Sequence, residues 1–182
     1  MHVEIGEHNT PDTGAGTVYV DCVARDGVDF VASWGVDRLP FDSASVDSLF
    51  ASHVIEHVPW FMIDKALAEA FRVLKPGGSI SLWAPDFAAI VEGYLAKAIP
   101  DGDPWRRFNK GGDFMRWVNG RLFAYFNDDE GPENLHKSAH DFPSLADSLV
   151  RARFVNPSRL KRTEGYAPHG SAEFGVIAYV PT

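Results

Sequence analysis

Four histidines of the chain form two pairs with the same spacing. His53 and His57 are four residues apart, and so are His136 and His140. On a helix this spacing places two imidazoles on one face, where they could hold a metal ion. The first pair, however, crosses the end of an expected strand, and the second precedes an expected helix. The sequence therefore predicts no metal site.

One of these histidines, His53, is placed to act as a base. An imidazole has an ordinary pKa near neutrality and can take a proton from a hydroxyl group. We expect His53 at the carboxyl end of a parallel strand, where ligands of open α/β sheets bind, with Glu56 and His57 one turn further on. His53 is our candidate catalytic residue, and the alternative is an ordinary strand-end histidine. For His57 we expect a structural role near the following helix.

A basic and aromatic stretch lies within 100–137. Five cations and one acid between Arg106 and Arg121 give it a net charge of +4, in a chain whose formal charge is −8. The cations are Arg106, Arg107, Lys110, Arg116 and Arg121. Guanidinium groups bind phosphate or carboxylate in bidentate fashion, and aromatic rings stack on a sugar or base. The alternative is a solvated amphipathic helix whose arginines pair with acids elsewhere.

Alternating strand-like and helix-like segments would position these side chains. Short β-branched runs bounded by Gly, Pro, Asn or Asp predict strands, and apolar residues at helical spacing predict helices. The expected strands are 2–5, 17–22, 28–32, 46–53, 79–84, 158–163 and 174–180. The expected helices are 60–74, 87–98 with Asp86 as its N-cap, and 142–153. This order predicts an α/β fold with a mostly parallel sheet that ends in an antiparallel hairpin.

The connection after the first strand is short. Only ten residues separate Gly6 from Thr17, whereas a mean helix alone takes about eleven residues. We therefore expect no helix there and a reduced helical layer on one face of the sheet. The apolar residues expected on this poorly covered face are Val3, Ile5, Val18, Val20, Phe30 and Val31. Such a patch predicts a two-fold homodimer, unless the aromatic stretch folds back over it.

Length and composition restrict the class of protein. A chain of 182 residues predicts one domain, 1–182, in which 100–137 forms a lid or substrate-binding insertion. The 17 basic and 25 acidic residues argue against nonspecific binding to nucleic acid or to an anionic membrane. No apolar run approaches the roughly 20 residues of a membrane span, and the first residues do not read as a leader. With a single cysteine, Cys22, we expect a cytoplasmic protein without disulfides.

Three segments in a fixed order carry a family resemblance. They are LPFDSASVD at 39–47, SHVIEHV at 52–58 and RVLKPGG at 72–78. Together they resemble the class I S-adenosylmethionine-dependent methyltransferases, in which such segments flank the fourth and fifth strands. Residues 2–21 and 136–142 are similar to a small, poorly characterised subgroup with a shortened cofactor loop. The resemblance implies a Rossmann-like methyltransferase sheet and S-adenosylmethionine as the cofactor.

The resemblance also suggests what individual residues contact. Gly6 would let the backbone approach the methionine moiety, and Asp21 at the end of the second strand would bind the ribose hydroxyls. Ser52 and His53 would also lie against the cofactor. We expect Arg106, Arg107, Trp117 and His136 to bind the substrate. The expected substrate is a small methyl acceptor that can be anionic, of the sugar or sugar-nucleotide class.

Two rival functions follow from the same residues. The shortened loop after Gly6 is also compatible with a non-catalytic, methyltransferase-like binding or scaffolding subunit. A nicotinamide-dependent dehydrogenase is disfavoured, because the loop contains no GxGxxG and LKPGG occurs where methyltransferases carry it. Titration with the cofactor separates the first rival from an enzyme before any substrate is known.

Overall fold

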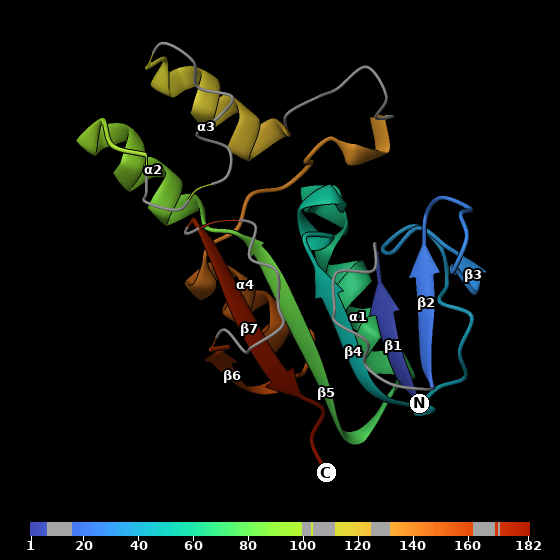
Figure 1. Ribbon diagram of the computed structural model, residues 1–182. Helices are drawn as coiled ribbons and strands as arrows, with labels where there is room; N and C mark the ends of the chain where they lie inside the picture. Colours follow the sequence, from blue (N-terminus) through green and yellow to red (C-terminus); the bar gives the residue numbers. More distant parts are fainter. Residues whose placement is uncertain (7–15, 100–102, 104–111, 125–131, 162–169, 171) are drawn as a thin grey trace.

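The chain folds around one seven-stranded sheet. The computed structural model describes residues 1–6, 16–99, 103, 112–124, 132–161, 170 and 172–182 (Figure 1). Within them the strand order is β3-β2-β1-β4-β5-β7-β6. The strands are β1 (His2–Ile5), β2 (Thr17–Asp21), β3 (Phe30–Val31), β4 (Val46–Ser52), β5 (Leu74–Pro85), β6 (Val155–Arg159) and β7 (Glu173–Tyr179).

The direction of the strands confirms the expected fold class. Each neighbouring pair from β3 to β5 is parallel, whereas β7 runs antiparallel to both β5 and β6. The expected closing hairpin is therefore present. β5 begins before the predicted strand 79–84, because Leu74 already pairs with Val46; after an irregularity that contains Gly77 at φ +76°, the pairing resumes at Ser79 opposite Ser48. A Cβ at Gly78 would lie 2.9 Å from the carbonyl oxygen of Lys75 and 3.0 Å from that of Asp47, so the close approach of the two strands requires glycine.

The helices begin where their sequences provide caps. Asp86 accepts hydrogen bonds from the amides of Ala88 and Ala89, as expected, and Asp141 forms a capping box with Ser144. The described α-helices are α1 (Ile63–Val73), α2 (Phe87–Ala96), α3 (Phe114–Phe123) and α4 (Phe142–Arg151), with 3₁₀ turns η1 (Ile55–His57), η2 (Trp60–Met62) and η4 (Pro132–Asn134). None of these helices is both long and apolar enough to cross a membrane.

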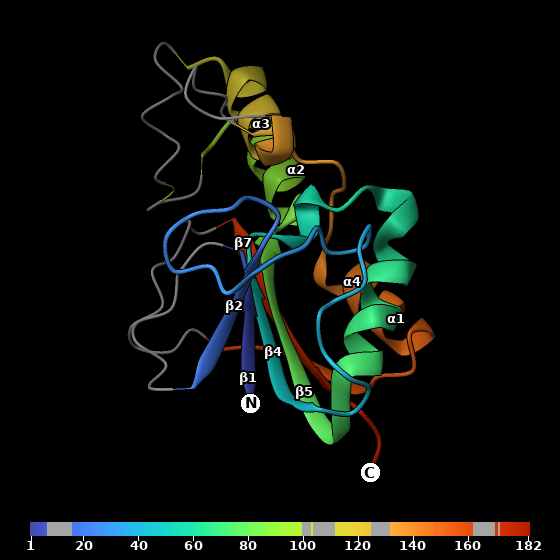
Figure 2. The ribbon, with the colours of Figure 1, turned by 90° about the vertical axis from the view of Figure 1, so that its right-hand side faces the viewer.

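The described helices cover the sheet unequally. Figure 2 shows α1 and α4 together on one face, and α2 and α3 beyond the edge of the sheet rather than flat against the other face. The core lies between the sheet and this single layer, where Leu67, Leu145 and Leu149 are fully buried together with Leu49 and Ile80. The expected reduction of one helical layer is confirmed.

The apolar patch expected near β1 and β2 is not exposed. Val3, Ile5 and Val20 are 2%, 3% and 0% exposed within a single chain, so this expectation was wrong. They point to the covered face and belong to the same core cluster as Trp34 and Leu39 from the connection before β4, which supplies cover in place of a helix. The prediction of a homodimer rested on this patch and therefore has no support from the structure. At the sheet edge, Phe30 and Val31 are exposed.

Two of the family-like segments are tied together by one side chain. The guanidinium of Arg72 donates to both carboxylate oxygens of Glu69, at 2.8 and 2.6 Å, and to the carbonyl oxygens of Leu39 and Phe41, at 3.2 and 2.9 Å. Glu69 in turn accepts a hydrogen bond of 2.8 Å from the amide of Leu39. These segments therefore fasten the connection before β4 to α1.

We expect Glu69→Gln to reduce stability in a pH-dependent way. The hydrogen bond from Arg72 lowers the pKa of Glu69 below its ordinary value, against the opposing effect of burial. The stabilisation is therefore full above the ordinary pKa of 4.5 and is lost as the pH falls through the lowered value in the folded chain. Urea unfolding at neutral pH should show a loss of about 1 kcal/mol in the variant, and the gap should close on acidification.

The exposed pair of Asp64 and Arg151 supplies the control for this experiment. Its side chains are 71% and 59% exposed and 3.3 Å apart, so Asp64→Asn should change the free energy of unfolding very little at any pH. A gap between wild type and Glu69→Gln that stays constant down to acid pH would contradict the assigned ion pair.

Candidate functional site

The glycine predicted at the end of β1 is required by its surroundings. Gly6 has φ +99°, and its amide donates a hydrogen bond of 2.8 Å to the carbonyl oxygen of Val20. A Cβ at this position would lie 2.4 Å from Cγ2 of Val54, which follows β4. Only glycine combines this backbone conformation with so close a contact. Gly6 therefore lets the backbone after β1 lie against the side chain of Val54 at the carboxyl edge of the sheet.

The next predicted cofactor residue, Asp21, ends β2 at the same edge. It is 5% exposed, its Oδ1 accepts a hydrogen bond of 2.8 Å from the amide of Val23, and Arg25 lies 3.5 Å away. Ser52, the last residue of β4, is 4% exposed and pairs in register with Trp83 of β5. The structure thus brings Gly6, Asp21 and Ser52 to the ends of three adjacent parallel strands.

His53 lies between two buried carboxylates. Its Nδ1 is 3.0 Å from Oε1 of Glu56, and its Nε2 is 3.0 Å from Oε2 of Glu173. Glu56 is 1% exposed and Glu173 is 9% exposed. The backbone of His53 is left-handed, with φ +55°, and its amide donates to the carbonyl oxygen of Trp83. Such a conformation in a non-glycine residue is costly and is concentrated at functional sites.

The carboxylates hold a proton on His53. Burial by itself lowers the pKa of His53, but the hydrogen bonds and charges of Glu173 and Glu56 raise it above its ordinary value. Burial likewise disfavours an ionised Glu56, yet His53 lowers the pKa of Glu56 to about 2. His53 thus lies between two buried carboxyl groups that favour its protonated form. The role of His53 as a base stays a prediction, and in this geometry both of its ring nitrogens already serve carboxylates.

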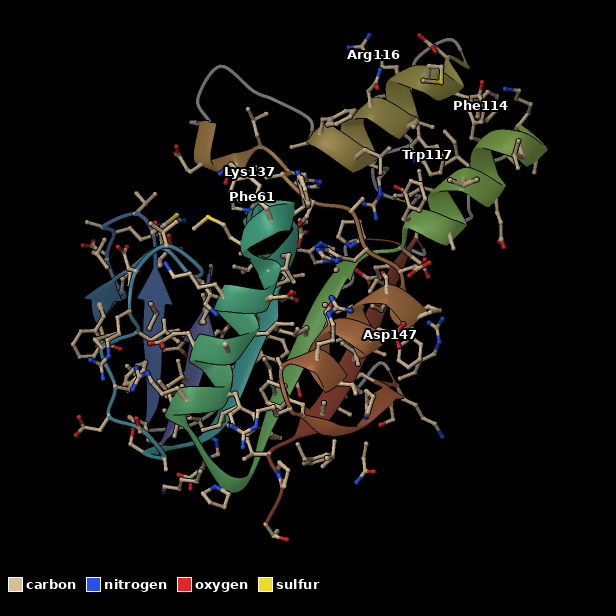
Figure 3. All side chains as sticks on the ribbon, turned by 180° about the vertical axis from the view of Figure 1, so that it is seen from behind. Phe61, Phe114, Arg116, Trp117, Lys137 and Asp147 are labelled. Carbon is tan, nitrogen blue, oxygen red and sulfur yellow. The ribbon has the colours of Figure 1, made fainter. Side chains whose placement is uncertain are left out.

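A second set of histidines lies beside Glu56. The amides of Lys137 and Ser138 donate to the carbonyl oxygen of Glu56, at 2.7 and 3.1 Å. These bonds hold the segment after η4 against η1 and place the rings of His136 and His57 edge to face, with centroids 4.9 Å apart. Figure 3 shows Lys137 beside Phe61, at the start of α1. The predicted substrate residue His136 therefore reaches the edge of the sheet.

The two histidines of the 136–140 pair are both neutral at physiological pH. Burial lowers the pKa of His136 to about 4, although the charge of Glu56 opposes this. Burial also lowers the pKa of His140, whose Nε2 lies 2.9 Å from the hydroxyl of Ser138. The pKa of His53, by contrast, is raised, because its two ring nitrogens are hydrogen-bonded to the carboxyl groups of Glu173 and Glu56.

The predicted role of Trp117 in substrate binding was wrong. Trp117 is 0% exposed and fills the space between α3 and α2, as Figure 3 shows, with its Nε1 3.3 Å from Oδ2 of Asp103. A Cβ on Gly93 of α2 would lie 2.9 Å from the indole ring, so α2 and α3 can pack this closely only because residue 93 has no side chain. The other two predicted substrate residues, Arg106 and Arg107, lie outside the described residues.

The remaining described cations of the basic stretch differ in their surroundings. Arg116 is exposed on α3. Arg121 is 4% exposed, donates to the carbonyl oxygen of Ala172 and lies 4.0 Å from Oδ2 of Asp103. Arg121 therefore ties α3 to the residue before β7, and the expectation that it binds a substrate anion is not met.

A separate groove lies at the opposite edge of the sheet. It is lined by residues from the end of α1, the start of β5 and the end of α4, among them Phe71, Leu74 and Arg153. Ligands of open α/β sheets bind at the carboxyl ends of the parallel strands. We therefore place the functional site at the edge that carries Gly6 and His53.

Comparison with known proteins agrees with this geometry. The profile of a family described as "Methyltransferase domain" matches residues 14–82. Two ubiquinone/menaquinone biosynthesis C-methyltransferases are similar: that of Bartonella henselae is 34% identical over 113 residues, covering 50% of this chain and 42% of the relative, and that of Rhizobium etli is 32% identical over 127 residues, covering 70% and 43%. These comparisons show similarity to class I S-adenosylmethionine-dependent methyltransferases.

Solved structures of methyltransferases have the same fold. The CurJ carbon methyltransferase superimposes with a TM-score of 0.59 at 17% identity, covering 100% of this chain and 48% of that one. The 1,6-didemethyltoxoflavin-N1-methyltransferase of Burkholderia thailandensis, solved with S-adenosylhomocysteine, gives 0.56 at 15% identity, covering 100% and 71%. The present chain spans less than half the length of the two relatives named above.

Proposed function

We propose that this chain is a class I S-adenosylmethionine-dependent methyltransferase that acts on a small molecule. The observation that carries the proposal is the arrangement of Gly6, Asp21 and His53 at the ends of three adjacent parallel strands. This is the edge at which an open α/β sheet binds its ligand, and the glycine, the ribose-binding carboxylate and the polar cluster there have separate tasks.

The cofactor would lie across the ends of β1 and β2. Gly6 allows close approach of the backbone to the methionine moiety, and Asp21 accepts hydrogen bonds from the ribose hydroxyls. Ser52 and His53 border the position of the sulfonium. The bound cofactor supplies an electrophilic methyl group.

The chain's own residues would orient the acceptor and take its proton. His53 is the proposed acceptor of the proton that the substrate releases. Because Glu173 and Glu56 raise its pKa, His53 must first give up a proton before it can act as this base. The hydrogen bonds to both carboxyl groups already fix its ring in place, so little reorganisation is needed.

The acceptor has two candidate classes. A sugar or sugar nucleotide is the expectation from the sequence, and the basic stretch with Arg106 and Arg107 motivates it. The relatives favour a second class, because they are ubiquinone/menaquinone biosynthesis C-methyltransferases. Incubation with deuterated-methyl S-adenosylmethionine and one acceptor panel from each class, followed by mass spectrometry, distinguishes a labelled sugar nucleotide from a labelled ring carbon.

The segment 100–137 is proposed to cover the acceptor. Figure 1 shows α2 and α3 above the edge at which β4 and β5 end. His136 bonds through Nδ1 to the carbonyl oxygen of Arg121, at 3.1 Å, so the end of α3 is linked to the site. Movement of α3 would therefore be transmitted to His136.

We expect Asp21→Ala to weaken S-adenosylhomocysteine binding by about 1–3 kcal/mol, or roughly 5- to 150-fold in Kd, through loss of charge-assisted hydrogen bonds. Isothermal titration calorimetry measures this directly. Asp21→Asn is the matched control for folding, because an amide oxygen can still accept the hydrogen bond from the amide of Val23. It should retain the turn and lose most of the contribution of the charge.

The result also separates the enzyme from its rival. Unchanged affinity in a folded Asp21→Ala variant would remove Asp21 from the site. If wild type binds neither S-adenosylmethionine nor S-adenosylhomocysteine at millimolar concentration, the non-catalytic binding subunit replaces the enzyme as the proposal.

A further inference from the structure

We propose that Glu56, His57 and His136 form a binding site for a divalent transition-metal ion of the zinc type. One carboxylate oxygen of Glu56 and one ring nitrogen of each histidine lie within 4.8 Å of one another. The residues come from η1 and from the segment after η4, which the hydrogen bonds to the carbonyl oxygen of Glu56 hold together. His57 belongs to one of the two histidine pairs in the sequence and His136 to the other. The four-residue spacing within each pair does not indicate that these two histidines lie together.

Two buried polar atoms of this cluster lack a partner. Oε2 of Glu56 and Nδ1 of His57 are inaccessible to solvent and make no hydrogen bond with the residues that the structure describes. Leaving a buried acceptor or donor unsatisfied costs roughly 1–3 kcal/mol, and more for a charged group. Since Glu56 is 1% exposed, its second oxygen is a buried negative charge beside two imidazoles. A bound cation would satisfy both atoms.

The third residue, His136, is oriented as a metal ligand usually is. Its Nδ1 lies 3.1 Å from the carbonyl oxygen of Arg121, so in the neutral ring Nδ1–H donates there and Nε2 carries the lone pair. Metal-binding histidines nearly always donate their other ring N–H to a carbonyl or carboxylate. Oε1 of Glu56 is likewise fixed, by His53.

The donor set selects the class of ion. Two imidazoles and one carboxylate suit Zn²⁺ and neighbouring first-row metals, whereas Mg²⁺ and Ca²⁺ prefer oxygen ligands. Three protein ligands leave a tetrahedral ion one open position. The inference stands whether or not the chain transfers a methyl group.

The test is metal binding to the whole chain after treatment with a chelator and dialysis. Titration with Co²⁺ should give visible d–d absorption of a four- or five-coordinate site that saturates at one equivalent and is displaced by Zn²⁺, but not by equal Mg²⁺. Metal affinity should fall in each of three ligand variants, His57→Gln, His136→Gln and Glu56→Gln. Removing a residue that only orients a metal ligand already lowers metal affinity by roughly 10- to 100-fold, so removing a ligand itself should cost at least as much.

His2→Gln is the matched control for histidine removal. His2 is exposed at the opposite edge of the sheet and bonds to Ser48, so its loss should leave the Co²⁺ spectrum and stoichiometry unchanged. Circular dichroism without metal establishes that each variant folds. Zn²⁺ should raise the melting temperature of wild type and of His2→Gln, but not that of the three ligand variants.

Three results would overturn the proposal. They are no Co²⁺ absorption from wild type at micromolar metal, binding that all three ligand variants retain, and loss of binding in His2→Gln. Should a ligand variant fail to fold, chemical modification of wild-type histidines decides. Zn²⁺ must then protect His57 and His136 and leave His2 reactive, and equal modification with and without Zn²⁺ counts against the site.

Discussion

Replacing His53 with alanine is expected to lower the free energy of unfolding by about 3–5 kcal/mol, the usual cost of removing one partner from a buried ion pair. The imidazole bonds to the carboxyl groups of Glu56 and Glu173, at 3.0 Å each, and these residues are 1% and 9% exposed. Without the imidazole, both buried carboxyl groups lose this partner. Urea unfolding in the presence of a chelator measures the loss without any contribution from bound ions.

His140 provides the matched comparison. It is 8% exposed, as deeply placed as the carboxylates, but its Nε2 partner is the neutral hydroxyl of Ser138. His140→Ala therefore strands no charge and should cost about half as much or less. The double variant His53→Ala, Glu173→Gln should regain part of the loss, because one of the two facing charges is gone. If His53→Ala costs no more than His140→Ala, the charged cluster has been misassigned.

Gly6→Ala is expected to lower the free energy of unfolding by about 2–4 kcal/mol and to weaken S-adenosylhomocysteine binding. Two effects add: a positive φ strains any L side chain, and the new methyl group overlaps Val54, whose Cγ2 would be 2.4 Å away. Relief of the overlap must move the backbone after β1 or after β4. Urea unfolding and calorimetry with the nucleoside thioether report the two consequences.

Two further variants separate strain from overlap. Gly16 also has a positive φ, +122°, but a Cβ there meets nothing within 4 Å among the described residues, so Gly16→Ala should show the strain alone, about 1 kcal/mol. Adding Val54→Ala to Gly6→Ala removes the overlap and should recover more stability than Val54→Ala alone costs. Equal losses in Gly6→Ala and Gly16→Ala would show that Val54 does not constrain the turn.

The sequence predicted those parts of the fold that depend on neighbours in the chain. Strands such as β1 and β4 were visible as β-branched runs, and Asp86 was recognisable as a cap because its partners are the next residues. The boundary of β5 was missed because Pro76 and the glycines after it are typical of a turn, whereas Leu74 before them already pairs with Val46 of β4. Local pattern and long-range pairing disagree there, and pairing decides.

The site was predicted less completely, for the same reason. His53 was found from its place at a strand end. Its partner Glu173 lies 120 residues further along the chain and reaches His53 only because β7 pairs with β5. Trp117 was misread because an aromatic residue among cations fits a ligand pocket as well as a contact between helices. Its burial against Gly93 is a property of how α2 and α3 pack, which spacing does not report.

The position of β7 has a consequence for how the molecule acquires its site. β7 enters between β5 and β6, and only then does Glu173 reach His53. The contact between His53 and Glu173 closes a loop of 120 residues, and this lowers the entropy of the chain more than a contact between near neighbours does. We therefore expect this contact to form late in folding. An intermediate with β1 to β5 in place would hold His53 and Glu56 without their third partner. Assembly of the charged cluster thus reports completion of the sheet, and a partly folded chain would have the parallel strands but not the site.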